Sequence, residues 1–140
     1  MTSTYTPPLT STPQPSTTNT SALYGPCVSQ SNPALTQGSR KASVSFASRS
    51  CLDLLDSTSV SFTIQWNTGQ SSTVAGNAST TIVGASRVLV VTGNVTAGLF
   101  AGDSFVQTAI APATDITLCT LGLGSVSSLY SVVTLEITSL

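Results

Sequence analysis

The chain carries five carboxylates, and these are the side chains best suited to acid–base or metal chemistry. Asp53 and Asp56 lie three residues apart, so a helical turn there would let them share a cation or divide the roles of acid and base. Glycosidase-type hydrolysis needs two facing carboxylates at a set separation, and Ca²⁺ needs several oxygen ligands. Neither pattern is present, so we expect Asp53, Asp56, Asp103, Asp115 and Glu136 to cap turns and to keep the protein in solution.

A serine nucleophile needs a neighbouring base, and the chain contains no His. Lys41 is the remaining candidate for that role, but it follows Arg40 in no recognised motif. We therefore predict a protein that is not an enzyme. We predict no catalytic, cofactor-binding or metal-binding residues and no cofactor.

The three cysteines, Cys27, Cys51 and Cys119, allow one disulfide bond and leave one thiol. Cys51 and Cys119 both lie in the part of the chain that is rich in predicted strands. A bond between them would join distant segments and lower the entropy of the denatured state. The alternative is three buried free thiols, because free Cys behaves as a small hydrophobic residue. We favour the Cys51–Cys119 bond.

Charged residues make up 6% of the chain, against about 25% in typical soluble proteins. The cations are Arg40, Lys41, Arg49 and Arg87, which are too few for the phosphate contacts that nucleic-acid binding requires. The apolar runs are much shorter than the ~20 residues of a membrane-spanning helix. We expect neither readout of a nucleic-acid sequence nor a membrane span.

Ser and Thr together supply roughly a third of the residues, so hydroxyl groups rather than charges must keep the surface wet. This composition is typical of surfaces outside cells, and we expect a secreted or cell-surface protein. The chain begins without the basic start and apolar run of a secretory signal. A virion component released by lysis is the alternative.

Residues 1–36 differ in composition from the rest of the chain. They hold six of the seven prolines, and residues 10–18 have almost nothing to bury. We predict a Ser/Thr/Pro-rich extended arm over residues 1–36 and a folded domain over residues 37–140. The arm offers little core to its large apolar side chains, so the predicted contacts with another subunit are Tyr5, Leu9, Leu23 and Tyr24.

From about residue 42, apolar residues alternate with hydroxyl-bearing ones, which is the period of a half-buried strand. Trp66 shares its phase with Val60, Phe62 and Ile64, so we expect it in the core; an exposed Trp66 would instead indicate sugar binding. The turn Asn67-Thr68-Gly69 reverses the chain. Further strands are predicted at residues 71–75, 79–83, 87–96, 104–110, 115–119 and 126–138, with a helical turn at 51–56.

Short strands joined by glycine-containing turns leave no room for crossover helices, so the sheet should be antiparallel. About seven or eight strands in about 100 residues match an all-β, Greek-key β-sandwich. We expect either an immunoglobulin-like sandwich or a compact jelly roll, carrying the extended N-terminal arm.

Several segments also resemble a known family. They are Val91–Asp103 with its Gly-Leu-Phe-Ala-Gly turn, Cys119, the Gly-rich Leu121–Val126, the closing Val133–Thr138, and the hairpin Trp66–Gly69. Together they resemble small secreted actinobacterial β-sandwich proteins of unassigned function, over about residues 42–138. The resemblance implies an extracellular location and brings no catalytic residues.

A charge-poor β-sandwich with an extended arm is best suited to structural assembly. An arm of this kind adds a strand to the open sheet edge of a neighbour, and the few charges leave such edges unguarded. We expect the protein to associate with itself or with another subunit, as a homo-oligomer or part of a multi-subunit assembly. The alternatives are a virus or phage capsid or decoration protein, and a carbohydrate- or surface-binding module.

Overall fold

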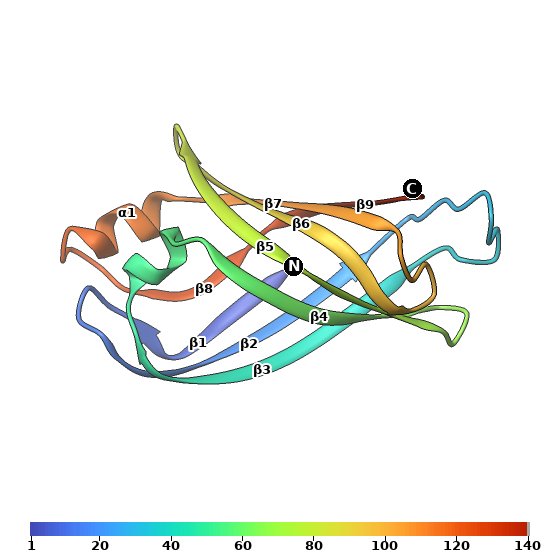
Figure 1. Ribbon diagram of the computed structural model, residues 1–140. Coiled ribbons are helices and arrows are strands. Elements are labelled where there is room, and N and C mark those ends of the chain that lie inside the picture. Colours follow the sequence, from blue (N-terminus) through green and yellow to red (C-terminus); the bar gives the residue numbers. More distant parts are fainter. Residues whose placement is uncertain (140) are drawn as a thin grey trace.

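The fold is seen in a computed structural model that describes residues 1–139. These residues form one antiparallel sheet, a 3-10 helix and a short α-helix (Figure 1). The elements are β1 (Thr2–Leu9), β2 (Gln14–Tyr24), β3 (Gly38–Arg49), η1 (Cys51–Leu55), β4 (Thr58–Trp66), β5 (Ser71–Val83), β6 (Ser86–Gly98), β7 (Ser104–Pro112), α1 (Thr114–Thr120), β8 (Val126–Tyr130) and β9 (Val132–Thr138).

Strands β1 to β7 pair with their neighbours in the sequence, because each connection is too short to cross the sheet. Strand β8 pairs with β1 and β9 pairs with β7, so the run from Val126 to Thr138 joins the two ends of the meander. Met1 and Ser131 exchange two backbone hydrogen bonds of 2.7 and 2.8 Å at the junction. The expected all-β antiparallel fold is confirmed, but a single, nearly barrel-shaped sheet takes the place of the Greek-key sandwich.

The predicted N-terminal arm is instead part of this sheet. Strands β1 and β2 lie between β8 and β3, and residues 25–37 form the loop that follows them. Threonine favours strands, and Pro7 and Pro8 lie beyond the paired stretch of β1 and β2, which ends at Thr6. Their missing N–H groups therefore cost this pairing nothing.

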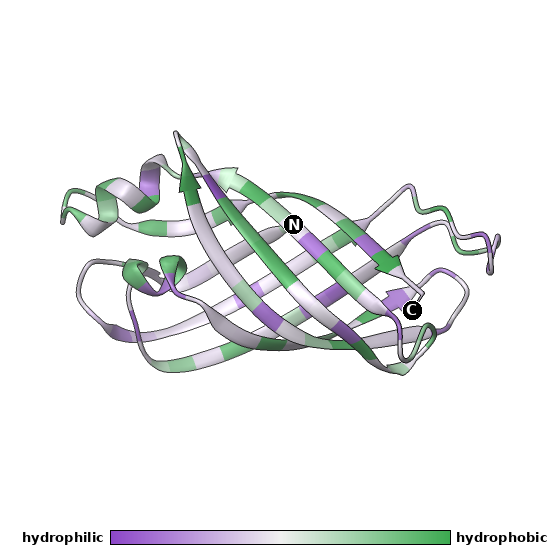
Figure 2. Ribbon diagram, turned by 45° about the horizontal axis from the view of Figure 1, so that its top comes forward, coloured by the Kyte–Doolittle hydropathy of each residue, from purple (hydrophilic) through white to green (hydrophobic). Residues whose placement is uncertain are grey.

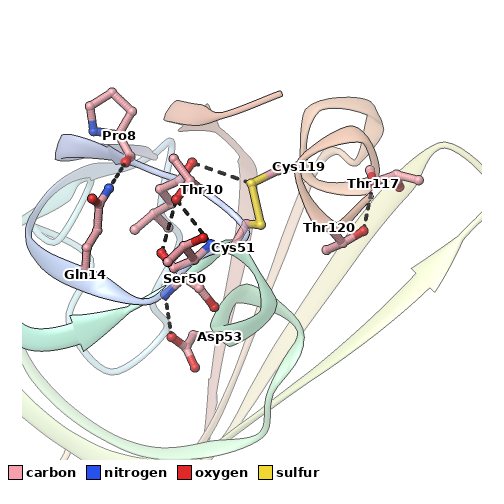
Figure 3. Close-up of a disulfide and its surroundings, with 11 residues drawn as sticks. Pro8, Thr10, Gln14, Ser50, Cys51, Asp53, Thr117, Cys119 and Thr120 are labelled. Atoms are coloured by element: carbon pink, nitrogen blue, oxygen red, sulfur yellow. Dashed lines mark hydrogen bonds between the residues drawn. A yellow bond between two sulfur atoms is a disulfide. The ribbon is translucent and has the colours of Figure 1, made fainter. Parts of the chain in front are cut away.

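A strand was also expected at residues 115–119, where the structure has α1. Ile116 and Cys119 are buried and lie three residues apart, whereas Asp115 and Leu118, each directly before one of them, are exposed. This is the spacing of a helix with one buried face. The disulfide bond links Cys119 to Cys51 of η1, as predicted (Figure 3). The predicted helical turn at 51–56 is likewise confirmed by η1.

Strand lengths differ in two further places. Strand β5 is continuous over Ser71–Val83, where two strands were expected, and the single strand expected over 126–138 is divided at Ser131. Hydrophobic and hydrophilic residues alternate along the strands (Figure 2). The apolar residues form one cluster beneath α1 and η1, around Leu9 and Ile116, and two further clusters, one of them around Trp66.

Candidate binding site at the open end of the sheet

The end of the sheet away from α1 contains a cavity of about 650 Å³. Its volume lies within the range of ligand-binding pockets, which is about 300–1,000 Å³. Its lining includes residues of β9, Tyr24 at the end of β2 and the loop residues 25–31. The aromatic and aliphatic part of the lining consists of Leu35, Trp66, Phe100, Val133, Leu135 and Ile137.

Trp66 forms the floor of this cavity and is held by two hydrogen bonds in series. Its indole N–H donates to Ser72 Oγ at 2.7 Å, and that hydroxyl donates to the Leu99 carbonyl at 2.6 Å. Phe100 meets the indole edge-to-face, with ring centroids 6.2 Å apart. Phe100 has a φ of 68° in the turn after β6, so the turn itself aims this ring at Trp66. Trp66 is 6% exposed, and the prediction that it packs in the core is confirmed.

Strand β9 has a free edge beside the cavity. It pairs with β7 along Val132–Thr138, whereas β1 on the other side reaches only the β8 half of the run. No other backbone hydrogen bond within residues 1–139 reaches β9. The inward side chains Val133, Leu135 and Ile137 are only half-buried, although they pack against the cluster around Trp66.

Polar groups also line the cavity, among them hydroxyl and amide side chains of the loop over residues 29–31. Tyr24 donates a buried 2.7 Å hydrogen bond to Gln107 Oε1; burial raises the pKa of its phenol, and the charge of Arg40 partly offsets this. The Cys27 thiol is half-buried, and burial raises its pKa. Asp103 is the carboxylate among the lining residues. The site therefore combines an apolar floor, neutral hydroxyl and thiol groups, and one negative charge.

The predicted interaction residues do not meet at this site. Tyr5 and Leu9 are buried in the cluster beneath α1, and Tyr24 is buried with its hydroxyl on Gln107. Of the four residues, Leu23 alone is exposed, at 82%, because its side chain points to the outer face of the sheet. The assumption that residues 1–36 have no core to enter is wrong, since closure of the sheet supplies one.

Sequence reasoning missed Cys27, Phe100, Asp103 and the edge of β9 as parts of one site. The alternation of β9 placed Val133, Leu135 and Ile137 on one face correctly. Nothing in that alternation shows that only one edge of the strand is paired.

The remaining carboxylates offer no second chemical site. Asp53 accepts a hydrogen bond from the Ser50 N–H at 2.8 Å and so caps η1, as expected of an acid at a turn (Figure 3). Within residues 1–139 no three Cys, Asp or Glu side chains are placed to hold a metal ion. The described residues also contain no helix with the length and hydropathy needed to cross a membrane.

No family model, curated protein or solved structure matches the chain. The resemblance to small secreted actinobacterial proteins therefore stays a prediction. The function has to be argued from the site itself.

Proposed function

We propose that this protein is a non-catalytic binding or assembly module that adds an extended segment of another polypeptide chain to the free edge of β9. The observation that carries the proposal is the unpaired edge of Val132–Thr138 beside a cavity with an apolar floor. The proposal keeps the assembly role expected from the sequence and moves the docking element from the N-terminal arm to β9.

Three properties of the site favour an extended polypeptide as the occupant. The free backbone N–H and C=O groups of a strand edge are satisfied best by another main chain. Alternate side chains of an added strand point to one face, here toward Leu135 and Trp66. The negative charge of Asp103 favours a segment with a Lys or Arg side chain at the point where it passes Asp103. The docked segment would run antiparallel to β9, in line with β1.

The location that fits this role is outside the cell or on its surface. Disulfide bonds persist mainly in oxidising compartments, and the Cys51–Cys119 bond agrees with such a location. A capsid or decoration protein remains an alternative that uses the same edge chemistry. A carbohydrate-binding module is less well supported, because its expected platform, Trp66, is buried.

Cys27 lines the cavity, so its rate of alkylation tests the proposal. The probe is a synthetic peptide in which Val and Leu alternate with Thr and one Lys. We expect it to slow the alkylation of Cys27. A peptide with Pro at a central position should not, because Pro cannot donate the main-chain hydrogen bond. If alkylation of Cys27 slows as the protein concentration is raised without peptide, the occupant is a second copy of this chain.

Charge supplies the matched control. Asp103→Asn should weaken protection by the Lys-containing peptide, whereas Asp115→Asn, which removes the same charge from α1, should not. Equal protection by the Pro peptide, or no protection by either the peptide or a second copy, would show that β9 does not accept a strand.

A further inference from the structure

Three of the four basic side chains lie on the inner face of the closed sheet. Arg40 and Arg87 are half-buried and pair with the buried residues Ala22 and Ala111 in the strand register. Arg49, at the end of β3, is also half-buried. Burial lowers the pKa of both Arg40 and Arg87, which records how poorly these charges are solvated.

Arg49 and Arg87 belong to one cluster around Tyr5. The guanidinium carbon of Arg49 lies 5.9 Å from the Tyr5 ring centroid and 4.1 Å from that of Phe46. Arg87 donates from Nε to the Leu54 carbonyl at 2.9 Å, which directs its side chain toward η1. Besides burial, Tyr5 raises the pKa of Arg87 and the like charge of Arg49 lowers it, so both groups lie close enough to act on Arg87.

The polar groups of this interior are incompletely satisfied. The Nε atoms of Arg40 and Arg49 and the hydroxyls of Thr18 and Thr80 are buried without a hydrogen-bond partner among residues 1–139. Thr18 lies directly opposite Tyr5 in the register of β1 and β2. No carboxylate is among the charges that act on Arg40 or Arg87. Buried charges are normally paired, and buried polar atoms without partners require an explanation such as an ion.

The wall of the sheet beside this cluster is open. Strands β3 and β4 pair only at Gly38 with Trp66 and at Ser39 with Gln65. From there they diverge toward η1, as Figure 1 shows. Val44 lies two residues before Phe46 on β3, so both side chains point to the inner face of the sheet. Val44 is nevertheless 48% exposed. A solute therefore meets apolar side chains of β3 on its way to Arg49.

We propose that Arg49 and Arg87 together bind an oxyanion that enters between β3 and β4, and that the preferred ligand is a carboxylate with an apolar tail. A carboxylate or phosphate matches the planar donors of guanidinium groups. The exposed Val44 and the half-buried Phe46 on the strand of Arg49 supply the apolar contact that a small inorganic anion would not use. This site lies away from the β9 cavity and does not depend on the peptide-binding proposal.

Dodecanoate, acetate and inorganic phosphate are the probes, with dodecanol as the uncharged match for dodecanoate. Binding is measured by isothermal titration and by the shift in melting temperature. We expect dodecanoate to bind most tightly, acetate and phosphate weakly, and dodecanol not at all. Arg49→Gln and Arg87→Gln should each weaken dodecanoate binding about tenfold to a hundredfold, the value of one or two charge-assisted hydrogen bonds.

Lys41→Gln is the control, because Lys41 is exposed on the same strand and its loss removes the same charge. It should leave dodecanoate binding unchanged. A purely structural role for Arg49 predicts instead that Arg49→Gln lowers the melting temperature without ligand. Arg49→Gln also loses the contacts with the Phe46 and Tyr5 rings, so the deciding readout is the shift in melting temperature that dodecanoate causes. Our proposal predicts that this shift is lost, and a purely structural role predicts that it is kept. Binding of dodecanol equal to that of dodecanoate, or equal losses in Lys41→Gln and Arg49→Gln, would overturn the proposal.

Discussion

The hydrogen bond from Tyr24 to Gln107 joins β2 to β7, two strands that are not neighbours in the sheet. Both residues are buried, so removal of the phenol oxygen leaves Gln107 Oε1 without a donor. We predict that Tyr24→Phe lowers the free energy of unfolding by about 1–3 kcal/mol, the cost of an unsatisfied buried acceptor. Urea denaturation followed by tryptophan fluorescence measures this loss.

Tyr130→Phe is the matched control, because Tyr130 is 67% exposed and a surface change of this kind stays within about 0.5 kcal/mol. A loss of equal size in both variants would contradict the role assigned to the Tyr24–Gln107 bond.

Residue-level prediction succeeded where the signal is carried by the residue type itself. The Cys51–Cys119 bond was favoured over three free thiols because both residues lie in the strand-rich part of the chain, and the phase of Trp66 was fixed by its own strand. It failed for Tyr5, Leu9 and Tyr24, whose burial depends on strands far away in the sequence. A count of nearby apolar residues cannot show that β8 will cover β1.

Among the elements, β5 and β6 approach each other closely at Gly76 and Gly93, which face each other in the register. A Cβ atom on Gly93 would collide with the Ala75 carbonyl oxygen and with Gly76 Cα. These are backbone atoms, which cannot move aside as a flexible side chain would. We predict that Gly93→Ala lowers the free energy of unfolding by about 1–3 kcal/mol, the usual cost of overpacking.

Gly124→Ala serves as the comparison, since its Cβ would lie at an ordinary 3.6 Å from Leu118 Cβ. Thermal unfolding of both variants separates close packing from a general effect of losing glycine. Stability of Gly93→Ala equal to that of the wild type would mean that the two strands lie farther apart than the structure places them.

The strands and helices were predicted well where the local residue pattern was long and clear, and poorly where it was short. The period of two identified most of β4, β6 and β7, because each is covered on one face only. The strand predicted over residues 87–96 contained Gly93, but alternation could not show that this glycine lets two backbones meet inside a strand pair. Residues 115–119 are too few for alternation to be told from helical spacing, and α1 was missed for that reason.

The closure of the whole molecule could not be read from the sequence. It depends on the division of one extended run at Ser131, whose two halves pair with β1 and β7. The free edge of β9 and the divergence of β3 from β4 are both consequences of how this closure is completed. Both candidate sites lie at these two places, so neither could be predicted before the pairing was known.

The divergence of β3 and β4 makes a prediction for the whole sheet. Strand β5 has partners on both sides over residues 72–78, whereas β3 from residue 40 onward pairs only with β2, and β4 before residue 65 pairs only with β5. Successive N–H groups of an antiparallel strand point to opposite sides. Amide hydrogen exchange followed by NMR should therefore be slow at nearly every residue of 72–78 in β5 but only at alternate residues of β3 and β4. Uniformly slow exchange across β3 and β4 would show that the strands pair fully in solution, and the path to Arg49 would then be closed.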